Sequence, residues 1–450
     1  MAGERAGPQR VTIHAIAHGG EGIGRVLELT DDARVWFIEG ALPGDTVLAE
    51  ATQVKTRMIR GRTLELLDPS PLRQDPPCAL ADRCGGCGWQ HVRADAQADL
   101  KAQIVTDLLR KFQVPIARVF ASPAAESYRR RARLHFEQGA GGLQLGFFGR
   151  GGHGVVDAAH CMVLDAPLRH ALSKIRTVAD VLPVRGELHG ISDGTRAILG
   201  VAAQAEIGGQ RLAMPPLIGD TRALRERLQA LLDDTLVGIV VAGPRGGVGV
   251  GESALDIDAS GPEDMSIRAG PFGFAQAQAD QNAALVAHVL RFAAGDRRRR
   301  GLELFAGAGN FTRGLAGVTR ELLAVETDAH GVEGLRQLAA RIAVRGGARL
   351  IVRREPAATA LSRAAEAGER FELVVLDPPR GGFGTGPARD LARVARGRTI
   401  YIACDPATLA RDLAVLTQAG HRIVDVSVFD LMPMTPEVEV VVVLDAPESA

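Results

Sequence analysis

Four of the five cysteines are spaced in the way that metal ligands are spaced. Cys78, Cys84 and Cys87 follow the pattern C-x5-C-x2-C, and Cys161 stands alone further along the chain. Four thiolates are the usual complement of a 4Fe-4S cluster or of a structural zinc ion, and the spacing alone leans toward zinc. Four unligated cysteines are a further alternative, which the close spacing of three of them disfavours. A disulfide framework is not expected in so long a chain with so few cysteines.

A glycine-rich loop, FAGAGN at 305–310, ends one apolar run, and Glu326 ends the next. Glycines in such a loop let the backbone approach a ligand and aim helix N–H groups at it. A carboxylate at the position of Glu326 can bind both hydroxyls of a ribose. Dinucleotides, flavins and S-adenosylmethionine (SAM) all use such a pair, which therefore indicates an adenosine cofactor. ATP is disfavoured because the chain has no GxxxxGK[ST] loop.

A rigid acidic turn, Asp377-Pro378-Pro379-Arg380, follows another apolar run. The two prolines restrict the backbone and would hold the Asp377 carboxylate over the cofactor pocket. Turns of this kind recur in SAM methyltransferases that act on planar nitrogen or carbon centres. The turn therefore favours SAM among the adenosine cofactors.

The elements that must position these residues follow from the apolar pattern. From about residue 270 onward, short apolar runs alternate with helix-length segments, which predicts a doubly wound α/β sheet. In such a sheet, ligands bind at the carboxyl ends of the strands, where the glycine loop, Glu326 and Asp377 would meet.

The rest of the chain predicts two further units. Short strands with glycine turns at 11–68 indicate a small β-barrel, and the proline-rich string PSPLRQDPP indicates a linker. A helix is expected at roughly 92–112, and it could pack on the C-terminal sheet. We therefore expect a multidomain chain: a β-barrel at 1–68, an α+β unit with the cysteine cluster at 69–265, and a Rossmann-like α/β unit at 266–450.

Composition limits the class of protein. The chain is 46% hydrophobic, which is enough to build real cores, and its longest apolar stretches are too short to cross a bilayer. The first residues lack the apolar run of a secretory signal, so we expect a cytoplasmic protein, acting as a monomer. The formal net charge is zero, but basic residues gather in three runs, around residues 55–62, 129–133 and 297–300. These runs are either solvated faces or a localised track for RNA.

The C-terminal third closely resembles the RNA uracil-5 methyltransferase family. The segments that carry the resemblance are LDPPRGG at 376–382, YIACDPATLARDL at 401–413 and FDLMPMTPEVEVVVVL at 429–444. FAQAQ at 274–278 is similar to the family's F-x-Q-x-N motif, and the N-terminal barrel resembles a TRAM domain. The cysteine spacing matches an iron–sulfur motif of some branches, so the resemblance implies a 4Fe-4S cluster in place of zinc.

The resemblance implies a covalent mechanism. Carbon-5 of uracil is a poor nucleophile, and it becomes reactive when a thiolate adds to carbon-6; a base then removes the carbon-5 proton. Cys404 would be the nucleophile and Glu439 the proton acceptor, although Glu437 lies two residues away and, on a strand, would share its face. The implied SAM-binding residues are Gln276, Phe305, Gly307, Gly309, Asn310, Glu326 and Asp377, and the implied cluster ligands are Cys78, Cys84, Cys87 and Cys161.

Three positions depart from the family pattern. Ala403 and Asp405 replace the common Ser and Asn around Cys404, and Gln278 replaces the Asn of F-x-Q-x-N. An ionised aspartate only accepts hydrogen bonds, whereas asparagine also donates them, so the details of uracil recognition are open.

The combination of barrel and cysteine cluster resembles the branch of the family that acts on large-subunit (23S-type) ribosomal RNA. Transfer RNA is the alternative substrate. A non-catalytic RNA-binding or ribosome assembly factor is the alternative class of protein, which Asp405 beside the nucleophile keeps open.

Overall fold

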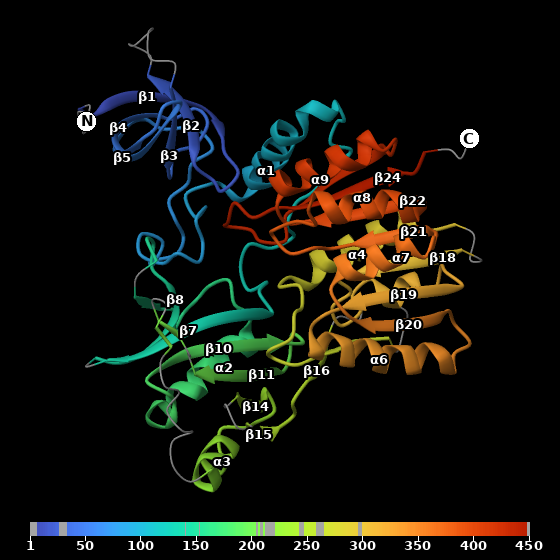
Figure 1. Ribbon diagram of the computed structural model, residues 1–450. Coiled ribbons are helices and arrows are strands. Elements are labelled where there is room, and N and C mark those ends of the chain that lie inside the picture. Colours follow the sequence, from blue (N-terminus) through green and yellow to red (C-terminus); the bar gives the residue numbers. More distant parts are fainter. Residues whose placement is uncertain are drawn as a thin grey trace.

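The computed structural model arranges the chain in three β-rich parts: a closed barrel, a seven-stranded sheet and an eight-stranded sheet (Figure 1). The eight-stranded sheet and its helices form one side of the molecule, and the barrel and the seven-stranded sheet lie on the other side, one above the other. The structure describes residues 7–26, 34–139, 141–152, 154–203, 206–207, 210–211, 221–242, 247–257, 265–295 and 299–447.

The N-terminal strands close into a barrel because apolar side chains alternate along them. Val11 and Ile13 on one strand and Trp36 and Ile38 on another meet in its core. The strand order around the barrel is β1-β2-β3-β5-β4. The strands are β1 (Gln9–Ile16), β2 (Gly22–Val26), β3 (Val35–Glu39), β4 (Thr46–Val54) and β5 (Met58–Asp68).

A buried carboxylate joins the barrel to the proline-rich linker. Asp45 is fully buried and accepts hydrogen bonds from the backbone N–H groups of Leu42 (2.6 Å) and Ser70 (2.8 Å). Its carboxylate also forms an ion pair of 2.6 Å with Arg73. A buried charge is stable only when it is fully paired, so Asp45 holds residues 69–77 against the barrel.

The segment after the linker packs on the eight-stranded sheet. Helix α1 (Ala94–Leu109), followed by a short 3-10 turn, contacts helix α9 (Pro406–Gln418) and strand β23 (Arg422–Phe429). The short strand β6 (Arg118–Phe120) then pairs in parallel with β23 at the edge of that sheet. This part of the chain precedes the central sheet in sequence but belongs to the C-terminal sheet in space.

The central part is a seven-stranded sheet in the order β15-β14-β11-β10-β7-β8-β9. Two helices, α2 (Ala166–Arg176) and α3 (Thr221–Gln229), add side chains to its apolar core. Two small hairpins, Glu206–Ile207 with Gln210–Arg211 and β16 (Leu255–Ile257) with β17 (Ile267–Ala269), complete this part. The sheet strands are β7 (Arg131–Gly139), β8 (Gly142–Phe148), β9 (Val155–Asp157), β10 (Arg185–Ser192), β11 (Ala197–Ala203), β14 (Leu236–Ala242) and β15 (Val248–Gly251).

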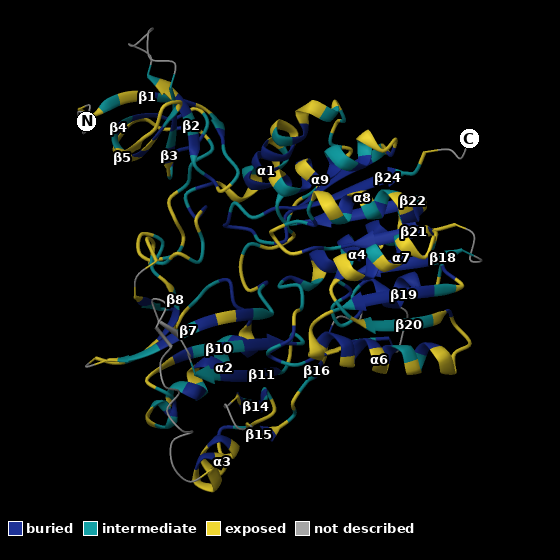
Figure 2. Cartoon of the chain, in the orientation of Figure 1, coloured by how far each residue is buried: buried dark blue, intermediate teal, exposed yellow. Residues whose placement is uncertain are grey.

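The C-terminal sheet has the order β20-β19-β18-β21-β22-β24-β23-β6 and is covered by helices on both faces. Its inner strands are largely buried, its edge strands β20 and β6 are not, and the outer faces of its helices are exposed (Figure 2). The strands not yet named are β18 (Arg300–Leu304), β19 (Glu321–Glu326), β20 (Arg349–Arg354), β21 (Phe371–Leu376), β22 (Ala395–Ala403) and β24 (Glu439–Asp445). The helices are α4 (Ala279–Ala293), α5 (Thr312–Leu315), α6 (Ala329–Val344), α7 (Ala357–Glu366), α8 (Thr385–Val394) and α9.

Both predicted architectures, the N-terminal barrel and the doubly wound C-terminal sheet, are confirmed. Five neighbouring strands of the sheet, from β20 to β22, run in parallel, and β24 is antiparallel to its neighbours. The sequence of β24 is a nearly unbroken run of valines, as is typical of a strand that is covered on both faces. Within the described residues, no helix is both long and apolar enough to cross a membrane.

Candidate active site

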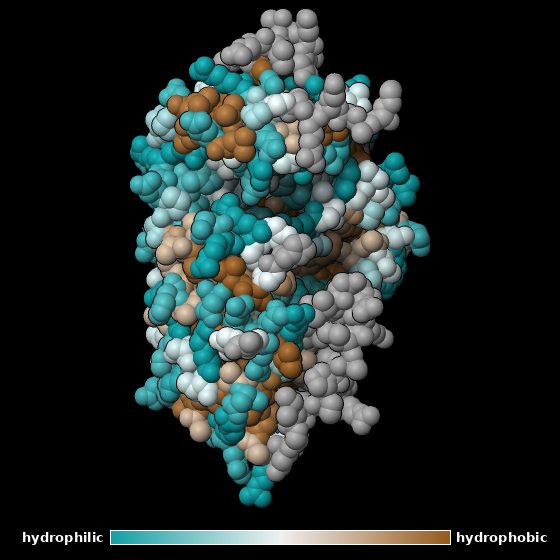
Figure 3. Space-filling model, turned by 90° about the vertical axis from the view of Figure 1, so that its left-hand side faces the viewer, coloured by the Kyte–Doolittle hydropathy of each residue, from teal (hydrophilic) through white to brown (hydrophobic). Residues whose placement is uncertain are grey.

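Most of the residues predicted for the cofactor and for catalysis meet at the edge of the sheet where β18, β19, β21 and β22 have their carboxyl ends. They line a cavity of about 650 Å³ between the C-terminal sheet and the central part of the chain. On the side of the molecule shown in Figure 3, the surface is hollowed at mid-height, with hydrophobic side chains at the back of the hollow. The predicted residues that line the cavity are Gln276, Phe305, Gly307, Asn310, Glu326, Asp377, Cys404 and Glu439.

The glycine loop needs its glycines for its backbone shape. Gly307 and Gly309 have φ values of 56° and 107°, in the left-handed region that favours glycine. Gly309 does not line the cavity: a Cβ added there would lie 2.7 Å from Leu338 of α6. Gly309 therefore lets the loop pack closely on that helix, while Gly307 faces the cavity.

Glu326 is held at the cavity by backbone donors. One carboxylate oxygen accepts the N–H of Gly307 at 2.8 Å, and the other accepts those of Thr327 and Asp328 at 2.6 and 2.7 Å. These bonds fix the carboxylate against the glycine loop. The oxygen that accepts the Gly307 N–H has a second lone pair, which can accept a ligand hydroxyl.

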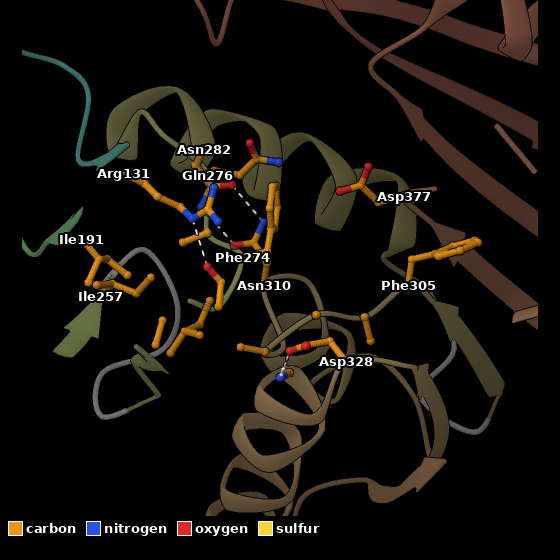
Figure 4. Close-up of a pocket in the computed structure, with 18 of the residues that line it drawn as sticks. Arg131, Ile191, Ile257, Phe274, Gln276, Asn282, Phe305, Asn310, Asp328 and Asp377 are labelled. Carbon is orange, nitrogen blue, oxygen red and sulfur yellow. Dashed lines mark hydrogen bonds between the residues drawn. The ribbon is translucent and has the colours of Figure 1, made fainter. Parts of the chain in front are cut away.

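The predicted residue Asn310 pairs at the same cavity with a second amide, Asn282, which was not predicted. Asn282 on α4 and Asn310 exchange two hydrogen bonds, of 3.0 and 2.9 Å. Gln276 lies near them, and Arg131 and Phe274 approach from the central part of the chain, opposite Phe305 and Asp377 (Figure 4). Arg131 lies over the ring of Phe274, 5.4 Å from its centroid. The only sequence signal for Asn282 was its position four residues after the glutamine-rich motif.

Two carboxyl groups near the cofactor loop have raised pKa values. Desolvation raises the pKa of Asp377, at the end of β21, to about 7. Burial also raises the pKa of Glu303, on β18, to about 8, although the Thr312 hydroxyl donates a hydrogen bond of 2.6 Å to its carboxylate. Near neutral pH, Glu303 is therefore mostly protonated and Asp377 titrates.

Cys404 and Glu439 lie beside each other because β22 pairs with β24. Ala403 is opposite Val440 in this antiparallel register, so the next pair along would be Cys404 and Glu439. Burial raises the pKa of the Cys404 thiol to about 12, the carboxyl groups of Glu439 and Asp377 add to the rise, and Arg380 opposes it. Burial also raises the pKa of Glu439 well above its ordinary value.

The expectation that Glu437 and Glu439 share a strand face is wrong. β24 begins at Glu439, and Glu437 lies in the preceding loop, where it forms an ion pair of 2.5 Å with Arg380. Both carboxylates line the cavity. Glu439 is buried, and its Oε1 has no hydrogen-bond partner within the described part of the chain. Glu437 is bound to a cation, whereas one oxygen of Glu439 is left for a ligand.

The cysteine cluster lies between the linker and the central sheet. Cys84 forms an isolated β-bridge with Gly149, and its sulfur accepts the N–H of Gly86 at 3.4 Å. Burial raises the pKa of Cys87 to about 11, and the neighbouring thiols of Cys161 and Cys84 contribute to the rise. These three thiols are thus close enough to interact. Among the described residues, no group of three or more His, Cys, Asp or Glu side chains is arranged to hold a metal ion.

The three basic runs differ in their surroundings. On the barrel, Arg60 pairs with Glu21 and Arg62 with Glu50. In the second run, Arg130 and Arg131 line the cavity and give that part of its wall a positive charge. Residues 297 and 298 of the third run lie outside the described residues.

Comparisons with known proteins agree with the resemblance to the RNA uracil-5 methyltransferase family. Residues 358–447 match the model of the tRNA (Uracil-5-)-methyltransferase family, and residues 8–64 match the TRAM domain. A 23S rRNA (uracil(1939)-C(5))-methyltransferase RlmD from Pseudomonas putida is 31% identical over 446 residues, which cover 97% of this chain and 94% of the relative. This chain belongs to the RNA uracil-5-methyltransferase family. The predicted enzyme class, a SAM-dependent RNA methyltransferase, is thereby confirmed.

Two further similar proteins also align over nearly the whole chain. A protein of the same name from Chromohalobacter salexigens is 31% identical over 453 residues, covering 96% of this chain and 88% of the relative. Among solved structures, the tRNA (uracil-54, C5)-methyltransferase of Pyrococcus abyssi, in complex with S-adenosyl-L-homocysteine, superposes with a TM-score of 0.70. It is 20% identical and covers 97% of this chain and 99% of its own, so it shows that the fold is shared throughout.

Glu303 generates a prediction about stability and pH. The folded protein keeps the Glu303 proton up to about pH 8, whereas an ordinary glutamic acid loses it near pH 4.5. The free energy of unfolding therefore falls as pH rises between these values, by up to about 1.4 kcal/mol per pH unit from this group. Glu303→Gln should make the decline shallower in urea titrations from pH 5 to 8 by removing the contribution of Glu303, and the exposed Glu366→Gln should leave it unchanged. Parallel curves for Glu303→Gln and the wild type would contradict the assignment.

Proposed function

We propose that this enzyme methylates carbon-5 of a uridine in large-subunit ribosomal RNA, with Cys404 as the covalent nucleophile and Glu439 as the proton acceptor. The observation that carries this proposal is the placement of both side chains at the adjoining ends of β22 and β24, in one cavity with Asp377. SAM would supply the methyl group as an electrophile.

The chemistry at the uracil follows from this placement. The Cys404 thiolate forms a bond to carbon-6, and the electrons of the 5,6 double bond move to give an enolate. Carbon-5 would then take the methyl group from the sulfonium sulfur of SAM, with release of S-adenosyl-L-homocysteine, and would become tetrahedral while still carrying its proton. Glu439 removes that proton, the double bond reforms and the thiolate leaves. The nucleophile and the base return to their starting forms once Glu439 releases this proton and the thiolate regains the proton that it lost before the attack.

The electrostatics of the cavity bear on both roles. A thiol with a pKa of about 12 is protonated near neutral pH, so Cys404 must lose its proton before it can attack. A base with a raised pKa holds an abstracted proton more firmly than an ordinary carboxylate. Arg380, which lowers the pKa values of both Cys404 and Glu439, is the cation that would favour their ionised forms.

The cofactor would lie along the glycine loop. Glu326 is placed to accept the ribose hydroxyls, and Gly307 lets the loop approach the ligand. Phe305, Gln276 and Asn310 border the same space and would complete the site. Gly309 would act through the shape of the loop, because it packs on α6 and does not face the cavity.

Ribosomal RNA is favoured as the substrate by the relatives that align over nearly the whole chain. Those relatives are named as 23S rRNA enzymes. The tRNA enzyme of Pyrococcus abyssi keeps transfer RNA as the second candidate, although its 20% identity speaks for the fold alone. We also propose that the enzyme acts as a monomer in the cytoplasm.

A 4Fe-4S cluster held by Cys78, Cys84, Cys87 and Cys161 is the remaining part of the proposal. All four cysteines are half-buried, and the pKa of Cys87 responds to the nearby thiols of Cys84 and Cys161, which supports a shared site. Four thiolates around iron would tie the linker segment to the central sheet.

The nucleophile and the base can be separated by trapping. Cys404→Ala should abolish methyl transfer and keep SAM binding, because the thiol acts only on RNA. Glu439→Gln should still allow addition and methylation, so a methylated covalent RNA–protein adduct should accumulate. RNA with 5-fluorouridine should trap the wild type for the same reason. Denaturing gels of the three reactions measure the adduct.

Glu437→Gln is the matched control for the base. The Glu437→Gln variant should not accumulate the adduct. In the wild type, Glu437 forms an ion pair with Arg380, which keeps its carboxylate from acting as the proton acceptor. Accumulation in Glu437→Gln alone would move the base by two residues. A wild-type adduct that persists in Cys404→Ala would refute the assigned nucleophile.

The substrate assignment predicts methylation of undermethylated large-subunit RNA in preference to unmodified transfer RNA. Because phosphate contacts carry much of the affinity for RNA, binding should fall steeply with salt concentration. Incorporation of labelled methyl groups into the two purified RNAs gives the comparison. Methylation of transfer RNA with none on ribosomal RNA would replace the first candidate with the second.

The cluster predicts about four iron atoms per chain in anaerobically purified protein, as four thiolate ligands imply. Cys161→Ser should lose most of this iron, measured by elemental analysis and by visible absorbance. Stoichiometric zinc without iron would contradict the iron assignment and return the site to the zinc alternative.

A further inference from the structure

A tight turn of the barrel reaches into the catalytic part of the molecule. This barrel turn, Ala17–Glu21, joins β1 to β2 and is closed by two backbone hydrogen bonds, from Ala17 to Glu21 (2.8 Å) and from Gly20 to Ala17 (2.9 Å). The turn lies against two segments that are remote in sequence, through the His18 side chain and through the backbone at Gly20. One contains Asp405, directly after the proposed nucleophile, and the other contains Pro436, three residues before the proposed base.

The first contact is a side-chain pair. Nε2 of His18 lies 3.2 Å from one carboxylate oxygen of Asp405. The other oxygen accepts the N–H of Thr408 at 2.8 Å and so caps the N-terminus of α9. Asp405 therefore connects three things: the end of the strand that carries Cys404, the helix that follows it, and the barrel.

The second contact depends on a glycine. Gly20 has a φ of 88°, and a Cβ added there would lie 2.5 Å from the indole nitrogen of Trp89 and 2.9 Å from Pro436. Trp89 is buried, and its backbone N–H donates to the carbonyl of Met434 at 2.9 Å. The barrel turn thus also packs against the loop that leads into β24.

We infer that the barrel turn, through His18 on Asp405 and Gly20 on Pro436, positions the two strand ends that carry Cys404 and Glu439. This inference rests on the proposed function, which gives those two residues their roles. His18 is a positioning residue, because it acts through Asp405 and does not line the cavity. The barrel then contributes to the chemical step.

The pair also accounts for the departure at Asp405. The family pattern has asparagine there, which can donate a hydrogen bond from its own amide. An ionised aspartate can only accept, so its half-buried carboxylate needs a donor from elsewhere. His18 is placed to supply that donor. In this chain the donor for Asp405 thus comes from the barrel.

The test is a single-turnover methyl-transfer assay on the full-length protein, with large-subunit RNA and SAM both saturating. His18→Ala should lower the rate constant by about 10- to 100-fold, the size expected when reacting groups are misplaced slightly, with the affinities for SAM and RNA unchanged. His18→Gln, whose amide can still donate to Asp405, should recover most of the rate. His14→Ala, an exposed histidine on the same barrel, is the matched control and should equal the wild type.

A double variant separates a lost contact from a general fault in folding. If His18 and Asp405 act through one contact, the double variant His18→Ala/Asp405→Asn should be no slower than His18→Ala alone. A rate unchanged in His18→Ala, a loss of RNA affinity alone, or equal defects in His18→Gln and His18→Ala would each overturn the inference. Wild-type transfer without a covalent adduct on 5-fluorouridine RNA would instead refute the proposed nucleophile, whatever His18 does.

Discussion

The antiparallel pairing of β22 with β24 is the constraint on which the site depends. A parallel sheet gathers only the carboxyl ends of its strands at one edge, and the start of β24 reaches that edge because this strand runs the other way. Cys404 after one strand and Glu439 at the start of the other then lie side by side. The glycine loop and Asp377 arrive at the same edge from the parallel strands, so one cavity can hold a cofactor and a base.

This geometry holds only if the loop before β24 is fixed. Lys101 on α1 is fully buried and pairs with Asp430 at 2.5 Å, and its ammonium group also donates to the carbonyl of Met432. Gln97, one turn earlier, accepts the N–H of Met434 at 2.7 Å. Removing one partner of such a buried pair leaves an uncompensated charge, so α1 is bound firmly to this loop. Elements from early in the chain therefore shape the far end of the cavity.

Much of the candidate site could be predicted from the sequence. The places of the glycine loop, Glu326 and Asp377 follow from strand periodicity and from where ligands bind in an α/β sheet. The family motif pointed to Cys404 and Glu439. The start of β24 at Glu439 supports the proposal of Glu439 over Glu437 as the base, and strand pattern alone does not give a boundary to within two residues.

Contacts between remote segments could not be predicted in this way. The pairing of β6 with β23, the amide pair of Asn282 and Asn310 and the contact of His18 with Asp405 depend on how finished elements dock. The central claim is the bond between Cys404 and carbon-6 of uracil. Peptide mapping by mass spectrometry of the wild-type enzyme trapped on 5-fluorouridine RNA tests it most directly. The peptide that contains Cys404 should carry the methylated fluorouridine; attachment to any other residue would contradict the account.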